Sequence, residues 1–309
     1  MKSYFIKFLM LLLIVTAIAY VIDMYLTHEF NKSNYYKPLW VDKFKNENFD
    51  FILLGNSRVY STIDVEKLEK ATGLKGLNLG LDGSNFASQL LMLKIFLENR
   101  NTTKRILFQV DPVVYNNYGE DEFSTYTFYP LLKRDYVFEH QKQFGFKYYL
   151  LRYIPMLRYA MFNFKWSPEN FTKLKLNSWK PPFDSHGSLI HDENFKGPKL
   201  QNFLAEEFFE NKYFNQIITL SKKQNIPITL FTAPYIAYNE KSGKVMQLFD
   251  QFIDKKGMEY HNYHNMFQGN YDLFYDNNHI NAKGVALFNQ HIATLLTPKR
   301  SQNLSATNP

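Results

Sequence analysis

Residues 49–80 read FDFILLGNSRVYSTIDVEKLEKATGLKGLNLG, and this stretch decides the fold class. Its first part, Phe49–Leu54, is a short apolar run that ends at a glycine, which is typical of a buried strand. Helix formers fill Asp64–Thr72, and Leu74–Leu79 has the composition of a second buried strand. A strand, a helix and a strand in this order predict a parallel sheet with helices packed against its faces.

The same alternation continues after residue 80 and is interrupted once. We predict, in chain order, a helix capped by Ser84, a strand at Ile106–Val110, a helix at Leu200–Gln224, a strand at Ile226–Phe231, a helix at Ser242–Lys256, a strand at Met258–Asn262 and a helix from near Asn281. Residues 113–197 are dense in aromatic residues and lysine and lack a clean period, which indicates an insertion. The sequence therefore predicts a three-layer α/β/α fold with a mostly parallel sheet at residues 49–297, followed by a polar tail at 298–309.

Composition excludes several classes of protein. Hydrophobic residues make up 45% of the 309 residues and aromatic residues 17%, so the chain is neither disordered nor collagen-like. The chain has no cysteine, which excludes disulfides, a thiol nucleophile and cysteine-ligated metal sites but still allows an oxidising compartment. A net charge of +7 suits an acidic envelope polymer, a membrane surface or nucleic acid, so charge alone selects no partner.

The N-terminus carries an uncharged apolar run. It covers Phe8–Ile22, with Lys2 and Lys7 before it and Asp23 after it. A helix needs about 20 residues to span a bilayer, and Tyr4–Leu26 reaches this length if Lys7 and Asp23 extend toward the two interfaces. The two lysines favour a cytoplasmic N-terminus, so we expect the body of the protein to lie on the other side of the membrane.

This interpretation divides the N-terminal region into an anchor at residues 1–27 and a linker at 28–48. A cleaved signal peptide is an alternative, because Ala17-Ile18-Ala19 resembles a cleavage site, and a buried core helix is another. We favour an uncleaved anchor because apolar residues continue past Ala19. With an anchor or a signal peptide, the body is exported to the periplasm or the outer face, and cleavage would make it a secreted protein.

Two polar motifs lie at ends of predicted elements. Gly55-Asn56-Ser57-Arg58 directly follows the first strand of the body, and Asp276-Asn277-Asn278-His279 directly precedes the last helix. A serine hydroxyl becomes a nucleophile when an imidazole takes its proton and a carboxylate orients that imidazole. We therefore predict a catalytic triad in which Ser57 is the nucleophile, His279 the base and Asp276 the orienting group.

Each of these residues also has a purely structural interpretation. Ser57 lies among turn formers, His279 precedes a helix that it could cap, and Asp276 could form an Asx turn. The occurrence of all three at strand and helix ends of one sheet edge favours the triad.

These motifs resemble those of the SGNH hydrolases, also called the GDSL family. Gly55-Asn56-Ser57 corresponds to the first block of the family, usually Gly-Asp-Ser, and Asp276 to His279 corresponds to its last block, Asp-x-x-His. The resemblance extends over residues 49–295 and implies a flavodoxin-like SGNH fold with acyl-ester chemistry.

The resemblance also implies an oxyanion hole. The second block of the family is a glycine whose N–H helps to bind the oxyanion, and the matching segment is Asn78–Ser84, where Gly83 is our first choice and Gly80 our second. The N–H of Ser57 would be a further donor. Asn56 replaces the more common Asp of the first block.

The third block departs from the family. The family has a Gly-x-Asn-Asp pattern whose Asn donates to the oxyanion, whereas this chain reads Gln109-Val110-Asp111-Pro112. An anionic Asp111 would oppose an oxyanion, so the third donor is either missing or supplied by Asn85 or Asn116. An N-terminal anchor with a Gly-x-Ser-Arg block and a relaxed third block is similar to the DltD-like and alginate-acetylation-like envelope proteins, which implies acyl decoration of surface polymers.

The other chemistry-bearing residues favour structural roles. Arg58 could bind a substrate carboxylate, but a surface ion pair is the favoured interpretation. His261 and His264 have neither the spacing nor the partners of a metal site, and His186 and His191 are more typical of solvated loops than of a substrate cleft. These histidines therefore give no reason to expect a metal. The chain contains no phosphate-binding glycine loop, so we expect no nucleotide cofactor.

Two functional hypotheses follow. The first is an anchored, extracytoplasmic ester hydrolase or acyltransferase, which takes an O-acyl group, most plausibly acetyl, from an acyl donor or an acylated envelope glycan. The second is a weakly active or inert SGNH-like protein that binds glycan or serves as a scaffold for a membrane-bound acyltransferase. Basic residues occur singly or in pairs, so we expect no nucleic-acid partner.

Overall fold

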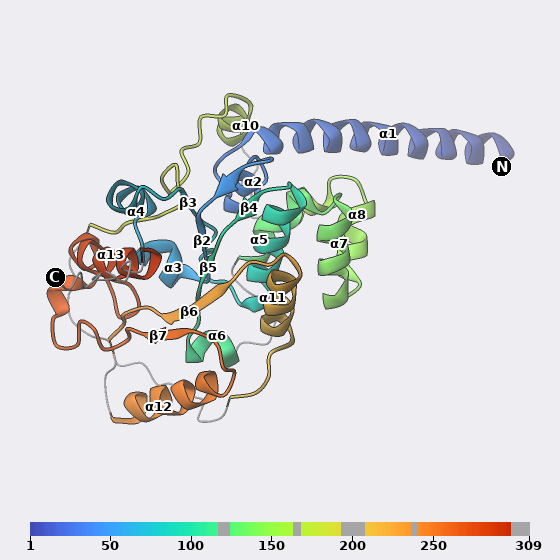
Figure 1. Cartoon of the computed structure of the whole chain (residues 1–309). Helices are drawn as coiled ribbons and strands as arrows, with labels where there is room; N and C mark the ends of the chain where they lie inside the picture. Colours follow the sequence, from blue (N-terminus) through green and yellow to red (C-terminus); the bar gives the residue numbers. More distant parts are fainter. Residues whose placement is uncertain (117–123, 163–167, 193–207, 237–239, 298–309) are drawn as a thin grey trace, which may run out of the picture.

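A five-stranded parallel sheet forms the centre of the computed structural model, which describes residues 1–116, 124–162, 168–192, 208–236 and 240–297. The strand order is β3-β2-β5-β6-β7, so the chain builds outward in both directions from the β2/β5 pair (Figure 1). The strands are β2 (Phe51–Leu54), β3 (Gly76–Asn78), β5 (Ile106–Gln109), β6 (Ile228–Thr232) and β7 (Tyr260–Asn262). Strands β1 (Asn48–Phe49) and β4 (Thr102–Thr103) form a second, two-stranded parallel sheet. The predicted α/β class with a mostly parallel sheet is confirmed.

Helices cover both faces of the sheet (Figure 1). Helix α4 (Val65–Thr72) packs with α13 (Ala282–Leu296) on one face, and α5 (Phe86–Glu98) packs with α11 (Lys212–Lys223) on the other. Alternate residues of β2 enter opposite cores, because side chains of a strand point alternately to its two faces. Helix α12 (Glu240–Asp254) joins the α5 core, while the short α3 (Ser57–Thr62) follows β2 directly.

Two predicted helix starts are corrected by caps. Asn85, not Ser84, caps α5, because its side-chain oxygen accepts hydrogen bonds from the N–H groups of Ala87 and Ser88. Helix α11 begins at Lys212 rather than Leu200, because Asn211 caps it in the same way. Residues 200–207 of that prediction lie outside the described residues, as does the predicted tail at 298–309.

The described parts of the predicted insertion form short helices with no strand among them. They are α6 (Pro112–Asn116), η1 (Thr125–Leu131), α7 (Asp135–Gln141), η2 (Lys142–Phe144), α8 (Lys147–Tyr153), α9 (Leu157–Met161) and α10 (Pro168–Lys175). The later 3₁₀ helix η3 (Tyr271–Leu273) precedes α13. Several of their aromatic side chains, among them Tyr148 and Tyr159, are fully buried in the core beside α5, which explains part of the aromatic content of this region.

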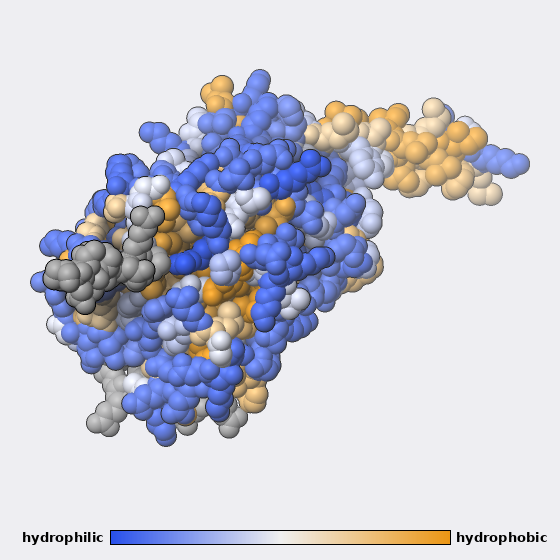
Figure 2. Space-filling view, viewed as in Figure 1, coloured by the Kyte–Doolittle hydropathy of each residue, from blue (hydrophilic) through white to orange (hydrophobic). Residues whose placement is uncertain are grey.

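The N-terminal helix α1 (Lys2–Lys32) projects far from the body (Figure 1). Its apolar window has a mean hydropathy of 2.6 and no buried residue, and Figure 2 shows it as a hydrophobic rod with a hydrophilic tip. Among the described residues it is the one helix long and apolar enough to cross a membrane, which is compatible with an anchor or a signal sequence.

Residues 28–48, predicted as a linker, are instead packed against the body. The last turns of α1 occupy residues 28–32, and α2 (Lys37–Val41) is buried along its whole length. Trp40 contacts Phe44 and Phe183 with ring centroids 4.9 and 5.1 Å apart, so the segment belongs to the main core.

The C-terminal part of α1, residues 23–32, packs with one side against the insertion, and we call it the foot of α1. Asp23 is fully buried and pairs with the fully buried Arg158 at 2.8 Å, and Lys133 also contacts its carboxylate. Tyr159 donates to Thr27 at 2.8 Å and stacks on Phe30. The sequence predicted that Asp23 would extend toward the lipid interface, but its carboxylate is enclosed by protein because the insertion supplies two cations to it.

Candidate active site

Ser57 lies at the carboxyl end of β2, where the sheet order reverses and α/β proteins form a crevice. Gly55 makes this turn possible: its φ is +154°, and a Cβ there would lie 2.9 Å from the Cβ of Gln109. Asn56 then caps α3 by accepting the N–H of Arg58 at 2.9 Å, which fixes Ser57 as the first residue of the helix. The side chain that the sequence predicted as nucleophile is therefore held at the sheet edge and is partly exposed.

The structure brings Ser57, His279 and Asp276 together in one line of hydrogen bonds. The Nε2 of His279 lies 2.8 Å from the Oγ of Ser57, and its Nδ1 lies 2.8 and 2.9 Å from the two carboxylate oxygens of Asp276. With Nδ1–H donating to Asp276, Nε2 is the acceptor for the serine hydroxyl. These are the contacts that a serine nucleophile, its base and an orienting carboxylate require.

The loop that carries His279 is fixed by its own hydrogen bonds. Oδ1 of Asp276 accepts the N–H groups of Asn278 at 2.8 Å and His279 at 2.9 Å, so the Asx turn and the contact with the imidazole occur together. Phe274 pairs with Ile280 across the loop, and the cap of α13 is Asn281 rather than His279. The three-residue spacing between Asp276 and His279 is explained by this single turn, which places the carboxylate directly behind the imidazole.

The electrostatics of this pair favour an ionised Asp276. Burial on its own raises the pKa of its carboxyl, but the hydrogen bond and charge of His279 and the two backbone N–H groups outweigh burial and hold this pKa below its usual value. The side chains of His279 and Asp276 are 18% and 44% exposed, so solvent and substrate can reach the pair.

The first two candidate oxyanion donors are the N–H groups of Gly83 and Ser57. The loop of Gly83 is tied to the turn before Ser57, because the N–H of Leu81 and the hydroxyl of Ser84 both donate to the carbonyl of Gly55, at 3.1 and 3.3 Å. Gly83 itself has a φ of +58°, and within the described residues neither its N–H nor that of Ser57 donates to another protein group.

Of the remaining donor candidates, one is engaged elsewhere, one acts as a helix cap through its oxygen and one has no described side chain. The N–H of Gly80 donates to the side chain of Asn78 at 2.8 Å, and the side-chain oxygen of Asn85 caps α5. Asn116 ends α6, and its side chain lies outside the described part of the chain.

Arg58 is buried, which corrects the predicted surface role. It is 4% exposed and lies between three groups: Nη1 is 3.4 Å from the carboxylate of Asp111, Nη2 donates to Asn278 at 3.0 Å, and the guanidinium stacks on Tyr235 at 4.3 Å. Arg58 therefore joins the Ser57 turn to the His279 loop.

Asp111 is fully buried, and protein groups surround its carboxylate. Gln109 donates to its Oδ2 at 2.7 Å, and the N–H of Val114 donates to its Oδ1 at 3.0 Å. The residue at the third-block position thus serves Arg58 rather than an oxyanion. Sequence reasoning missed Asn278 and Tyr235 as parts of this network, although Asn278 lies inside the Asp276–His279 motif and Tyr235 follows the end of β6.

An aromatic cavity of about 250 Å³ adjoins the Gly83 loop. Tyr60, in the same helix as Ser57, lines it together with Asp82, and the insertion contributes Tyr126 and Ser124, whose hydroxyl donates to the carbonyl of Gly83 at 3.4 Å. Lys37 also lines the cavity, with its Nζ 4.1 Å above the ring of Tyr60, and burial lowers the pKa of this amine well below its usual value. Polar groups and ring faces therefore meet beside the candidate oxyanion loop.

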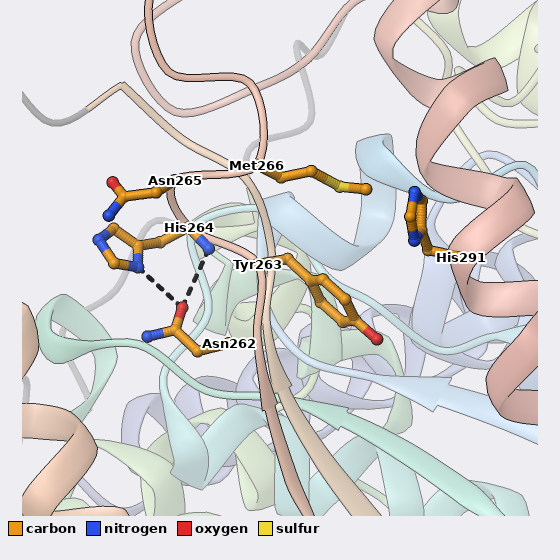
Figure 3. A pocket seen from close by; sticks show the side chains of 6 residues that line it. All are labelled: Asn262, Tyr263, His264, Asn265, Met266 and His291. Atoms are coloured by element: carbon orange, nitrogen blue, oxygen red, sulfur yellow. Dashed lines mark hydrogen bonds between the residues drawn. The ribbon is translucent and has the colours of Figure 1, made fainter.

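A second hollow, of about 500 Å³, lies beyond β7 (Figure 3). Its lining includes His264 and His291, but the imidazole of His264 lies 2.8 Å from Asn262, and His261 pairs with Glu259 instead. The two histidines of the HNYH motif do not converge on one point.

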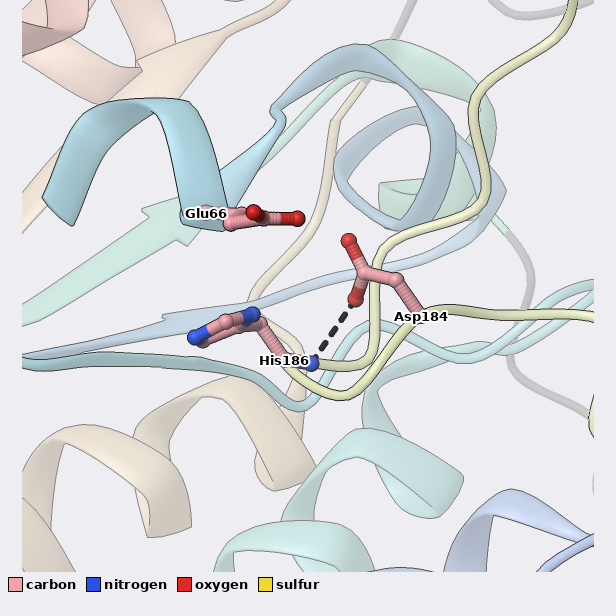
Figure 4. Close-up of side chains that lie close together, drawn as sticks. All are labelled: Glu66, Asp184 and His186. Atoms are coloured by element: carbon pink, nitrogen blue, oxygen red, sulfur yellow. Dashed lines mark hydrogen bonds between the residues drawn. The ribbon is translucent and has the colours of Figure 1, made fainter. Parts of the chain in front are cut away.

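Glu66, Asp184 and His186 gather near the start of α4 (Figure 4), with potential ligand atoms within 4.8 Å of one another. Their groups have protein partners: Glu66 pairs with Lys70, Asp184 accepts the N–H of His186, and the His186 ring contacts Glu69. His191 lies closer to the triad, since its ring stacks on Tyr275 and is centred 6.1 Å from that of His279.

Comparisons with known proteins give matches among solved structures. No family model matches the chain, and no curated protein matches its sequence. Among solved structures, a Bacteroides fragilis protein described as a candidate acylhydrolase is similar, with 11% identity, a TM-score of 0.38, and coverage of 81% of this chain and 86% of that chain. These comparisons assign the chain to neither the DltD-like nor the alginate-acetylation-like group.

Proposed function

We propose that this protein is a membrane-anchored, extracytoplasmic serine enzyme of SGNH type that cleaves or transfers an O-acyl group, most plausibly acetyl, on a cell-envelope polysaccharide. The observation that carries the proposal is the continuous hydrogen-bond chain from Ser57 through His279 to Asp276. The resemblance of the three sequence blocks to the SGNH family supports the same chemistry.

The reaction begins when the Oγ of Ser57 attacks the carbonyl carbon of the ester and its proton passes to Nε2 of His279. The N–H groups of Ser57 and Gly83 stabilise the oxyanion of the tetrahedral intermediate. When the intermediate collapses, the leaving alcohol takes the proton from His279 and the acyl group stays on Ser57. Water or a sugar hydroxyl then attacks the acyl-enzyme, with His279 as base, and restores the serine. Asp276 stays ionised throughout.

The aromatic cavity beside Gly83 supports a sugar as the other part of the substrate. Faces of pyranose rings pack on aromatic side chains such as Tyr60 and Tyr126, while hydroxyl groups need polar partners such as Asp82 and Ser124. We propose that a residue of the polysaccharide occupies this cavity and that its ester or acceptor hydroxyl points toward Ser57.

Helix α1 supports the proposed location. Its exposed apolar run follows Lys2 and Lys7, and under the positive-inside rule these lysines favour a cytoplasmic N-terminus and a catalytic body on the other side of the membrane.

One observation favours a second candidate function, a weakly active or inert scaffold for a membrane-bound acyltransferase. Asp111 occupies the third-block position and binds Arg58, so it cannot donate to an oxyanion. Loss of one such donor typically lowers turnover about 100- to 1000-fold, which leaves room for measurable acyl transfer.

Hydrolysis of a short-chain aryl ester by the full chain in detergent tests the proposal. Ser57→Ala and His279→Ala should each lower kcat by at least about 10⁴-fold. Ser178→Ala, at an exposed residue, and His261→Ala, at a residue whose side chain is 34% exposed, are matched controls that should keep the parent activity. A folded parent with no activity, or equal activity in all variants, would exclude the esterase and favour the scaffold.

A further inference from the structure

Helix α8 presents an apolar face to solvent. Its other side is anchored in the core by Tyr148 and Leu151, both fully buried. The exposed residues, which we call the α8 face, are Phe146 (72% exposed), Tyr149 (38%), Leu150 (38%), Tyr153 (60%) and Ile154 (45%). Contiguous exposed apolar residues of this size mark a surface that binds a partner or a membrane.

The α8 face lies next to the point where α1 leaves the body. The turn after Ile154 contacts α1 directly, because the N–H of Met156 donates to Asp23 at 3.0 Å and Arg158 pairs with the same carboxylate. Figure 1 shows α7 and α8 as the parts of the body that reach farthest along the direction in which α1 projects. The end of the α8 face therefore lies two residues before a chain contact with Asp23, where the exposed apolar run of α1 ends.

The length of the exposed run in α1 determines where Asp23 would lie relative to a bilayer. From Tyr4 to Ile22 the helix has 19 residues, which at 1.5 Å each span about 28 Å, close to the hydrocarbon thickness of a bilayer of about 30 Å. If this run spans the membrane, Asp23 lies at its outer surface. The adjoining Tyr153 and Ile154 then lie at the same level.

We propose that the α8 face inserts into the interfacial layer of the bilayer that α1 spans. This inference rests on the membrane anchor of the proposed function and extends it to a second attachment site. Lipid fits this face better than a protein partner, because the face is continuous with a membrane helix and carries two tyrosines, a residue type that favours the interface between hydrocarbon and water. Two attachments fix the tilt of the body and hold the active site at a constant distance from the membrane.

Tryptophan quenching by brominated lipids tests this contact. The full chain would be reconstituted in vesicles of phosphatidylcholine and phosphatidylglycerol, with or without bromine on the acyl chains. Phe146→Trp and Tyr153→Trp probe the α8 face, Ile14→Trp probes the middle of α1, and Leu287→Trp, 42% exposed on α13, probes the body surface. The signal is the emission added to that of the native residues Trp40, Trp166 and Trp179.

Brominated lipid should quench the added emission at residues 14, 146 and 153, and leave that at residue 287 unchanged. Quenching at residue 14 without quenching at 146 and 153 would overturn the inference and leave the anchor intact. Absence of quenching at residue 14 and at the α8 face would remove the anchor as well. A blue-shifted emission at 146 and 153 that bromine does not quench would mean that a protein, such as a second copy, covers the face, and would also overturn the inference. Circular dichroism of each variant checks that it is folded.

Discussion

The catalytic edge and the foot of α1 each place a carboxylate against a nitrogen-bearing side chain, but they differ in access to water. At the catalytic edge the side chains of His279 and Asp276 are 18% and 44% exposed, whereas at the foot Asp23 and Arg158 are both completely enclosed. An exposed pair adds little stability and can exchange protons with a substrate. An enclosed pair can do no chemistry, and removal of one partner leaves a buried charge without compensation. A carboxylate contact therefore supports catalysis at the catalytic edge, whereas at the foot a carboxylate contact holds α1 in place against the body.

The largest effect should follow from Asp276→Asn, which removes the carboxylate of the catalytic edge. The amide keeps the shape of the loop but can no longer accept the Nδ1–H of His279 as an anion, so we expect kcat to fall by about 10⁴-fold, as for other triad carboxylates. Thermal stability should change little. Aryl ester turnover and a melting curve measure both, with Asp272→Asn as the exposed control in the same loop. Near-normal turnover in Asp276→Asn would contradict the assigned role.

Arg158→Met should affect stability rather than chemistry. It leaves the carboxylate of Asp23 buried with Lys133 as its remaining cation, so we expect the free energy of unfolding to fall by about 3–5 kcal/mol. Urea unfolding of the full chain in detergent measures this. The double variant Asp23→Leu with Arg158→Met removes both charges and should recover most of the loss. A single variant as stable as the parent would show that the enclosed pair has no positioning role.

The comparison also shows what sequence could predict. The strands, and the approach of Ser57 to His279, follow from local patterns, because carboxyl ends of parallel strands meet at one edge. The burial of Arg58 does not, since its partners Asp111, Tyr235 and Asn278 come from three separate chain segments. Asp23 was predicted at the lipid interface for a similar reason: Arg158 lies in the insertion, where no periodic pattern indicated a neighbour. The burial of the segment predicted as a linker could not be predicted either, because Trp40 and Lys37 pack against loops far away in the sequence.

A buried histidine outside both regions should make stability depend on pH. His140 is 3% exposed, and burial, together with the charges of Lys94 and Lys212, lowers its pKa to about 3. The unfolded chain takes up this proton at about pH 6.5, so the stability present above pH 6.5 should fall by up to about 1.4 kcal/mol for each unit below it until the folded pKa is reached. Unfolding curves between pH 7 and 4.5 measure the slope, and His140→Gln should flatten it. An unchanged slope in the variant would assign the effect to other groups.

The smallest effect concerns Tyr126, which connects the two regions. Its ring packs 5.9 Å from that of Phe162, which contacts Phe30 in the foot, and it also lines the aromatic cavity beside Gly83. A stacking contact contributes about 0.5–1.5 kcal/mol, so Tyr126→Ala should raise KM for an acylated oligosaccharide by about three- to tenfold. The turnover of a small aryl ester should stay the same. A fall in aryl ester turnover would mean that Tyr126 supports the fold of the site rather than a sugar.

The foot also determines where this protein can be divided. A soluble version that begins near residue 30 would discard Asp23 and Thr27 and leave the guanidinium of Arg158 enclosed without its carboxylate. A version that begins near residue 20 would discard most of the exposed apolar run and keep every contact of the foot. The border between what can be removed and what cannot therefore lies within one uninterrupted helix, about ten residues before that helix ends.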